Sequence, residues 1–366
     1  MINTLSGGGA EKVLLDLLNQ LDPEMYDLEL VTITGGVHEK EIPEYVNYRR
    51  IINVKNRRLG KFLSKIIYKL PGSLFASLYL GGVRDIEIAY LEGLPTRFVA
   101  AKKDAVSKIA FVHCDLSVNN IISPFYKDDA ETKREYETFD RVCFVSDNSK
   151  KGFETVFGPL EKSCVVHNVV DYDKIIERSF DVVPEHFETD GVKIVTVGRL
   201  VKEKAFDRLI RIAAELEKKY GFELWIIGEG SERETLEDLI AEKNVSSVRL
   251  MGYRDNPYPL IKQADLFVCS SLTEGYSTAV TEAVVLDLPV LTTKCAGMEE
   301  ILKNGKYGII VDNSEECLKS SLEQIVKEPT IIVPFKNNIQ DDKKHSRKQG
   351  PINEYVNIFD LVSHRS

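Results

Sequence analysis

Several features are scarce or missing in this sequence, and each of them excludes a class of protein. Only six cysteines occur in 366 residues, scattered and without any C-x-x-C pair, so neither a zinc site nor a disulfide framework is expected. No apolar run approaches the roughly 20 residues that span a bilayer, and no signal peptide is evident. A net charge of -9 provides no excess of cations for binding nucleic acid. We therefore expect a cytoplasmic protein with buried, reduced thiols.

One stretch lacks acidic residues altogether. Between 46 and 84 there is no Asp or Glu, although the whole chain is acidic. Its basic residues are Arg49, Arg50, Lys55, Arg57, Arg58, Lys61, Lys65, Lys69 and Arg84. Apolar residues at helical spacing lie opposite Lys61, Lys65 and Lys69, so a basic amphipathic helix over 57–70 is expected to suit an anionic membrane surface, on the inner face of the membrane. An ordinary packed helix with a solvated lysine face gives the same pattern, and both readings stay open.

What the sequence does have is a regular alternation of short β-rich runs and helical patterns. The chain is too long for one hydrophobic core and suggests two domains. Strands are predicted at 28–34, 48–54, 86–91, 109–113, 142–146 and 164–168, and then at 193–197, 223–227, 248–251, 266–269, 290–293 and 308–311. Several are near-continuous runs of Val, Ile and Leu, as in parallel strands covered on both faces. The alternation predicts an α/β protein with two doubly wound, Rossmann-like domains.

The same pattern divides the chain into segments. We expect an N-terminal domain over 1–170, a hinge over 171–190 and a C-terminal domain over 191–335. Residues 336–351 are polar and charged, which predicts a loop. The last apolar pattern, within 352–366, predicts a short closing helix that joins the N-terminal domain.

The most informative stretch is 274–282, where seven residues separate Glu274 from Glu282. A buried strand is predicted before it and a buried helix after it, so the pair lies on a strand-to-helix turn, where α/β folds bind ligands. If all these residues were helical, the two Cα atoms would be ~12 Å apart and face different directions, which indicates different roles. The alternative, that both acids only complement the helix dipole, stays open on this spacing alone.

Cations follow the strand predicted at 193–197. Gly198 and Arg199 come directly after it, and Lys204 precedes the next predicted helix. A guanidinium fork and an ammonium point charge at this position suit a diphosphate. A solvated loop is the alternative, and it is favoured by Glu203, which separates two lysines; Arg199 is the residue least easily explained in that way.

Two further strand ends have the character of a pocket for a base and a ribose. Gly228 closes one strand tightly. Tyr253 and Arg254 follow another and offer a ring and a guanidinium to a nucleobase. Each of these signals is weak by itself.

In the first half of the chain, a glycine turn and a histidine are the candidate residues. Gly8 and Gly9 open a helical pattern, where backbone N–H groups approach a phosphate or a sugar closely. His113 ends the strand predicted at 109–113 and would face the crevice at that end of the sheet. A plain turn and a core or surface histidine explain the same residues.

Taken together and in this order, these residues resemble a retaining glycosyltransferase of the GT-B type, specifically family 4 (glycosyltransferase group 1). The likeness lies in the glycine loop, the histidine strand end, the Arg199 and Lys204 phosphate-binding pair, and the E-x7-E motif at 274–282. It covers nearly the whole chain. Such enzymes have two Rossmann-like domains that face a central cleft.

The resemblance implies a role for each residue. Arg199 and Lys204 would stabilise the departing nucleoside diphosphate in place of a metal, so neither a metal nor a cofactor is expected. Glu282 would hold the ribose hydroxyls, and Glu274 would bind the donor sugar. The implied catalytic set is Arg199, Lys204, Glu274 and His113. The implied donor-binding set is Gly8, Gly9, Gly198, Gly228, Tyr253, Arg254, Gly275, Tyr276, Ser277 and Glu282.

The implied reaction is transfer of a sugar from a nucleotide sugar, with a UDP-sugar as the expected donor, to a glycan or lipid-linked acceptor in cell-surface polysaccharide synthesis. The anomeric configuration would be retained. Two alternatives stay open: a nucleotide-sugar hydrolase or epimerase of the same fold, and a catalytically inactive scaffold.

The sequence departs from the family pattern at its start. Family members usually have a full strand before the glycine loop, whereas only residues 1–5 precede Ser6 here. The first strand of the N-terminal sheet is therefore expected to be missing, or replaced by a stub at 1–5. A missing central strand would leave its two neighbours unpaired and weaken the domain.

Overall fold

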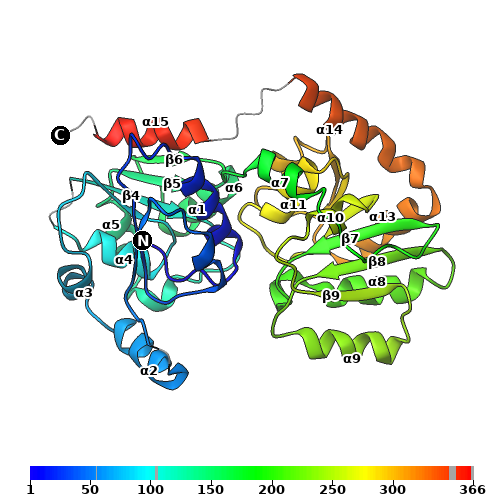
Figure 1. Cartoon of the computed structure of the whole chain (residues 1–366), viewed down its shortest axis with the longest axis horizontal. Helices are drawn as coiled ribbons and strands as arrows, with labels where there is room; N and C mark the ends of the chain where they lie inside the picture. Colours follow the sequence, from blue (N-terminus) through cyan, green and yellow to red (C-terminus); the bar gives the residue numbers. More distant parts are fainter. Residues whose placement is uncertain (55, 104–105, 346–351, 364–366) are drawn as a thin grey trace. The chain divides into compact units, whose positions relative to one another are not determined.

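The computed structural model describes residues 1–54, 56–103, 106–345 and 352–363. The chain forms two compact units, which can be followed by colour along the sequence (Figure 1). The first unit is Met1–Val170 with Gln349–Ser366, and the second is Asp171–Lys348. Among the described residues, no helix is long and apolar enough to cross a membrane.

The strands of the first unit follow the apolar runs of the sequence. They are β1 (Glu29–Thr32), β2 (Asn47–Arg50), β3 (Ile86–Ala89), β4 (Ser107–Val112), β5 (Arg141–Phe144) and β6 (Ser163–Val165). These strands pair in parallel within the described residues: β1 pairs with β2, and β3 to β6 pair in sequence order. Each strand lies at one of the predicted positions, with ends that differ by a few residues.

Residues 1–3 join these two groups of strands into one sheet. Ile2 forms a parallel bridge with Thr32, and its N–H donates to the carbonyl of Val31 at 3.0 Å. On the other side, the N–H of Tyr90 donates to the carbonyl of Met1 at 2.9 Å. The central strand is therefore not missing but shortened, as in the stub alternative. The resulting order is β2, β1, residues 1–3, β3, β4, β5 and β6.

Helices alternate with the strands of the first unit, and some of them begin at a polar residue whose side chain caps the helix. They are α1 (Gly9–Gln20), α2 (Arg57–Ile67), α3 (Gly72–Tyr79), α4 (Leu94–Ala100), α5 (Asp129–Tyr136), α6 (Asp147–Phe157) and α15 (Ile352–Ser363), with the short 3-10 turns η1 (Val37–Glu41) and η2 (Ser123–Phe125). The Asp128 side chain, for example, accepts from the N–H of Glu131 at the start of α5. The closing helix α15 packs on the sheet, where the Tyr355 ring stacks on Phe111 with centroids 5.4 Å apart.

The second unit has a six-stranded parallel sheet. Its strands are β7 (Val192–Val197), β8 (Phe222–Ile227), β9 (Val248–Gly252), β10 (Leu266–Cys269), β11 (Val290–Thr293) and β12 (Gly308–Val311), in the order β12-β11-β10-β7-β8-β9. The chain runs outward from β7 to β9, returns to β10, and then runs outward in the other direction. This is the doubly wound arrangement, and its reversal point lies between β7 and β10.

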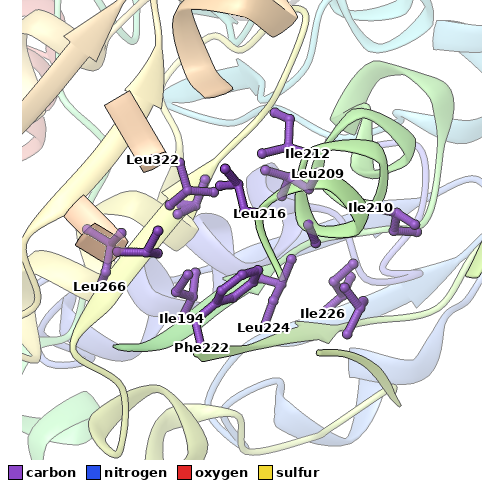
Figure 2. Packing of buried hydrophobic residues seen from close by; sticks show 14 of the residues in the cluster. Ile194, Leu209, Ile210, Ile212, Leu216, Phe222, Leu224, Ile226, Leu266 and Leu322 are labelled. Carbon is purple, nitrogen blue, oxygen red and sulfur yellow. The ribbon is translucent and has the colours of Figure 1, made fainter. Parts of the chain in front are cut away.

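Helices of the second unit cover this sheet. They are α7 (Tyr172–Arg178), α8 (Phe206–Leu216), α9 (Arg233–Lys243), α10 (Tyr258–Lys262), α11 (Thr278–Val285), α12 (Met298–Ile301), α13 (Glu315–Lys327) and α14 (Val333–His345), with the 3-10 turns η3 (Lys202–Lys204) and η4 (Pro329–Ile332). Figure 2 shows the core, where Ile194 and Leu224 of the sheet share a buried cluster with Leu209 and Leu216 of α8. Burying each such side chain stabilises the fold by ~1.5–3 kcal/mol, which holds the strand ends in place.

Residues 171–190, where a hinge is predicted, pack within the second unit. They begin with α7, and the Phe187 ring stacks on Trp225 with centroids 3.8 Å apart. The N–H of Glu188 donates to the buried carboxylate of Glu223 at 2.7 Å. The structure thus adds this segment to the domain that was expected to start at 191.

The prediction of a polar loop over 336–351 was wrong for residues 336–345, which are helical and belong to α14. The carboxylate of Asp342 accepts from Lys306 at 2.8 Å and from the hydroxyl of Tyr307 at 2.6 Å. Ile339, one turn earlier in the helix, is buried. Partners distant in sequence therefore stabilise a helix whose own composition is polar. Residues 346–351 lie outside the described part of the chain.

Candidate functional site

The reversal point of the second sheet brings two predicted motifs to the same edge. β7 and β10 are parallel neighbours, with Ile194 paired to Leu266. Gly198 and Arg199 follow the carboxyl end of β7, and Glu274 lies in the turn that follows β10. In open parallel sheets, ligands bind at the carboxyl ends of the strands, at the point where the strand order reverses.

Lys204 and Glu274 meet at this edge as an ion pair. The Nζ atom of Lys204 lies 2.5 Å from Oε1 of Glu274, and the two side chains are 23% and 11% exposed. The hydroxyl of Ser271 also donates to Oε1 of Glu274, at 2.5 Å. Burial by itself lowers the pKa of Lys204, but the adjacent carboxylate raises it, and the net result is a raised pKa. The lysine therefore stays cationic in a partly desolvated position, as a diphosphate-binding group must.

Arg199 provides a second positive charge beside Lys204. Its side chain is exposed, whereas Leu200, the next residue, is fully buried. The N–H of Leu200 donates to the carbonyl of Glu229 at 2.9 Å, which fixes the backbone on which Arg199 stands. The charge of Arg199 opposes the rise in the pKa of Lys204, so the two cations act on one region. An anion placed there would be attracted by both.

Glu282 lies in α11, about one turn after the helix begins, and it is buried. The residues between the two acids form the loop and the first turn of α11, with Gly275 and Ser277 buried and Tyr276 half-buried. This loop is held from outside by Gly297. Gly297 has φ +75°, and a Cβ atom there would lie 2.7 Å from the carbonyl of Gly275, so only glycine fits. The loop and the helix start therefore have little freedom to move apart.

Arg208 is a buried residue at this site that the sequence analysis missed. Its Nε donates to the carbonyl of Ser270 at 2.8 Å, and its Nη2 donates to the carbonyl of Ser271 at 3.0 Å. Nη2 also donates to Oδ1 of Asn313 at 2.9 Å. Arg208 thus fixes the end of β10 just before the turn that carries Glu274. In the sequence it has no distinguishing signal, because its partners are mostly backbone carbonyls.

The predicted base pocket is only partly assembled. Gly228 has φ +150°, and a Cβ atom there would lie 1.9 Å from the carbonyl of Gly198, so the ends of β7 and β8 touch. Tyr253 is 52% exposed. Arg254 pairs with Glu185 at 2.6 Å, so a base would have to compete with this carboxylate for the guanidinium.

The remaining candidates belong to the first unit. His113 follows β4, and its N–H donates to Oε2 of Glu92 at 2.9 Å. Its Nε2 atom is buried without a hydrogen-bond partner among the described residues, and burial lowers the pKa of the ring. Gly8 and Gly9 stand at the start of α1, as predicted. A Cβ atom on Gly8 would lie 2.0 Å from the carboxylate of Glu11, so this acid occupies the space beside the turn.

Two doubly wound parallel sheets are the architecture of the GT-B class of fold. Here the second sheet has a paired cation and carboxylate at its reversal point. The solved structure of HepE from Anabaena in complex with UDP and glucose has this fold; the match has a TM-score of 0.68 and 16% identity, over 99% of this chain and 98% of that one. At this identity, the likeness shows the fold alone.

Residues 178–345, nearly all of the second unit, match the family described as Glycosyl transferases group 1. Over this region the chain is similar to that family, in line with the sequence resemblance. An uncharacterized glycosyltransferase of Methanocaldococcus jannaschii is 28% identical over 249 residues, which are 62% of this chain and 61% of that protein. The Campylobacter jejuni protein named N-acetylgalactosamine-N,N'-diacetylbacillosaminyl-diphospho-undecaprenol 4-alpha-N-acetylgalactosaminyltransferase is 25% identical over 365 residues, 94% of this chain and 93% of that protein.

Proposed function

We propose that this protein is a retaining glycosyltransferase. It transfers a sugar from a nucleotide sugar, with a UDP-sugar as donor, to a glycan or lipid-linked acceptor in cell-surface polysaccharide synthesis. The observation that carries the proposal is the Lys204–Glu274 ion pair at the reversal point of the second sheet, with the exposed Arg199 beside it. A cation pair with an adjacent carboxylate suits a ligand that has a diphosphate at one end and sugar hydroxyls at the other.

The proposed chemistry uses these groups in sequence. The bond between the anomeric carbon and the diphosphate oxygen breaks, and its electron pair stays on the diphosphate. Arg199 and Lys204 stabilise that developing charge, which is commonly the largest catalytic contribution. Glu274 and the loop before α11 bind the donor sugar, and Glu282 binds the ribose. A hydroxyl oxygen of the acceptor bonds to the anomeric carbon on the face that the leaving group occupied, and its proton passes to the departing diphosphate oxygen.

Two relatives support the finer parts of this proposal. The HepE structure contains UDP and glucose, which favours a UDP-sugar as the donor. The Campylobacter jejuni relative is named for transfer to a diphospho-undecaprenol sugar, which favours a lipid-linked acceptor. Retention of configuration and independence of metal ions are what the family resemblance implies.

The surface around α2 supports a site of action at a membrane. Leu59, Phe62 and Ile66 are 46%, 60% and 44% exposed, at positions that repeat along one face of the helix. Arg58 and Lys65 are exposed on the same helix. Exposed apolar side chains beside cations suit the interface of an anionic bilayer. Lys55, together with the side chains of Arg57 and Lys61, lies outside the described part of the chain.

Ligand binding and transfer test the donor site directly. Titration calorimetry with UDP, GDP and ADP, followed by transfer from the matching nucleotide sugars, identifies the donor. Lys204→Ala should weaken nucleotide binding by about 10- to 100-fold, because a charge-assisted bond is worth ~1.5–3 kcal/mol. Lys202→Ala, which removes an exposed lysine from the same 3-10 turn, should change the affinity less than twofold. Absence of binding to all three nucleotides, or equal affinities of both variants, would contradict the proposal.

A further inference from the structure

The first sheet also has a reversal point, and two loops meet there. The chain passes from residues 1–3 outward to β1 and β2, and then returns to β3 on the other side. The loop after residues 1–3 is the glycine turn that leads into α1. The loop after β1 contains η1. Both loops follow the carboxyl ends of neighbouring parallel strands, where such sheets bind ligands.

The two loops are held against each other by their backbones. The N–H of His38 donates to the carbonyl of Leu5 at 3.1 Å, and the hydroxyl of Thr4 donates to the carbonyl of Gly35 at 2.9 Å. A Cβ atom on Gly36 would lie 2.1 Å from the carbonyl carbon of Leu5, so the contact requires glycine. His38 is therefore placed on the glycine turn by main-chain contacts and does not stand on a loose loop.

The ring of His38 is oriented by a carboxylate. Its Nδ1 atom lies 2.6 Å from Oε1 of Glu41, and the two side chains are 14% and 29% exposed. A carboxylate only accepts hydrogen bonds, so Nδ1 carries the proton and Nε2 is the acceptor in the neutral ring. Among the described residues, Nε2 has no hydrogen-bond partner, and it lies 3.8 Å from the position of a Cβ atom on Gly7. Nε2 of this fixed imidazole therefore lies beside the glycine turn.

The charges around this ring favour a hydroxyl over an anion. The carboxylate of Glu11, in the first turn of α1, occupies the space beside Gly8. Glu39, the residue after His38, is paired with Arg50 at 2.9 Å, so this guanidinium is already neutralised. A phosphate beside the turn would meet Glu11, whereas a sugar hydroxyl would find an acceptor at Nε2 of His38 and backbone N–H groups at the turn.

We infer that His38, oriented by Glu41, is a specificity-determining residue that accepts a hydrogen bond from a hydroxyl of the acceptor sugar. This rests on the proposed glycosyltransferase function, because it assigns an acceptor to the unit that lacks the donor residues Lys204 and Glu274. His38 selects and orients the hydroxyl. The bond-making step is the one already described.

The experiment measures transfer from the nucleotide sugar to a panel of octyl glycosides of hexoses and N-acetylhexosamines. His38→Asn keeps an N–H that reaches Glu41 but removes the group at Nε2, so it should raise the acceptor KM about tenfold and leave the donor KM within twofold. His38→Gln places an amide near the position of Nε2 and should restore part of the loss. His167→Asn is the matched control, because His167 also pairs with a glutamate, Glu354, at 3.5 Å, but elsewhere on the unit.

Each outcome decides the matter. An acceptor KM for His38→Asn equal to that of the wild type, or changed no more than in His167→Asn, overturns the inference. Nucleotide binding without transfer to any glycoside overturns the assignment of a sugar hydroxyl and leaves the donor site standing. Absence of binding to UDP, GDP and ADP overturns the proposed function and this inference together.

Discussion

Arg208 offers the sharpest test of how the donor loop is built. Its guanidinium is buried and donates to two carbonyls at the end of β10 and to Asn313. Arg208→Met keeps most of the side-chain volume and removes every donor. The carbonyl of Ser270 loses its partner, whereas the carbonyl of Ser271 keeps the hydroxyl of Thr293 at 2.7 Å. The damage should therefore centre on the strand end just before the Glu274 turn.

The magnitude follows from these contacts. Each charge-assisted bond contributes ~1.5–3 kcal/mol, and an unpaired buried carbonyl costs a further ~1–3 kcal/mol. Burial lowers the pKa of Arg208, which shows that its charge is desolvated, and replacing it with an apolar side chain recovers part of that cost. We expect a net loss of ~2–4 kcal/mol in the free energy of unfolding of the second unit, or a fall in Tm of about 5–15 °C.

Thermal unfolding with nucleotide titration measures both effects. Arg211→Met is the control, since Arg211 lies one turn later in α8 and the side chains of its ion pairs with Asp207 and Glu315 are between 38% and 45% exposed. Such pairs are worth ~0–1 kcal/mol, so the control should shift Tm by only a few degrees and leave nucleotide affinity unchanged. If Arg208→Met has the same Tm and the same nucleotide affinity as Arg211→Met, the reasoning about the strand end is refuted.

Three further predictions concern other parts of the chain. Burial lowers the pKa of His113 below its unfolded value of ~6.5, so the unfolded state binds more protons and stability should fall as pH drops from 6.5. In urea unfolding at pH 7.5 and 5.5, His113→Asn should lose less stability between the two pH values than the wild type. An equal loss in both proteins would refute this prediction. Gly228→Ala should destabilise the protein by ~2 kcal/mol or more, because the added Cβ atom would lie 1.9 Å from a carbonyl. Gly81→Ala, with no atom within 4 Å of the added Cβ, should be tolerated in the same melting experiment. Similar melting temperatures of the two variants would be evidence against the close approach. Phe62→Ser should reduce sedimentation of the protein with phosphatidylglycerol vesicles several-fold. Val182→Ser, which alters a 98% exposed apolar residue of the other unit, should have no effect. Identical sedimentation of the two variants would leave α2 as an ordinary surface helix.

The sequence was sufficient for the strands because burial on both faces leaves a local record. Runs such as the one at 266–269 are apolar at every position, and a parallel strand is the short element that needs this. The Glu274 and Lys204 motifs were equally visible, because each lies in the segment between such a run and the next helix. What spacing alone left open was their contact, which depends on β7 and β10 being neighbours although they are far apart in the chain.

The errors arose where long-range partners decide the structure. Residues 336–345 are polar, and their helix is stabilised by Lys306 and Tyr307, which no local pattern connects to Asp342. Arg208 was missed for a related reason, since backbone carbonyls leave no trace in side-chain composition. The stub at residues 1–3 is too short for periodicity to be recognised, yet bonds to two neighbours give it the central place in the sheet.

The position of α15 has a consequence for the order in which the protein is made. Its residues Tyr355, Phe359 and Val362 are buried in the core of the first unit, although they follow the whole second unit in the sequence. During synthesis, the second unit has all of its residues before α15 emerges from the ribosome. The first unit, begun earlier, lacks part of its core until then. The unit that is started first is therefore completed last, with an apolar face exposed throughout the interval.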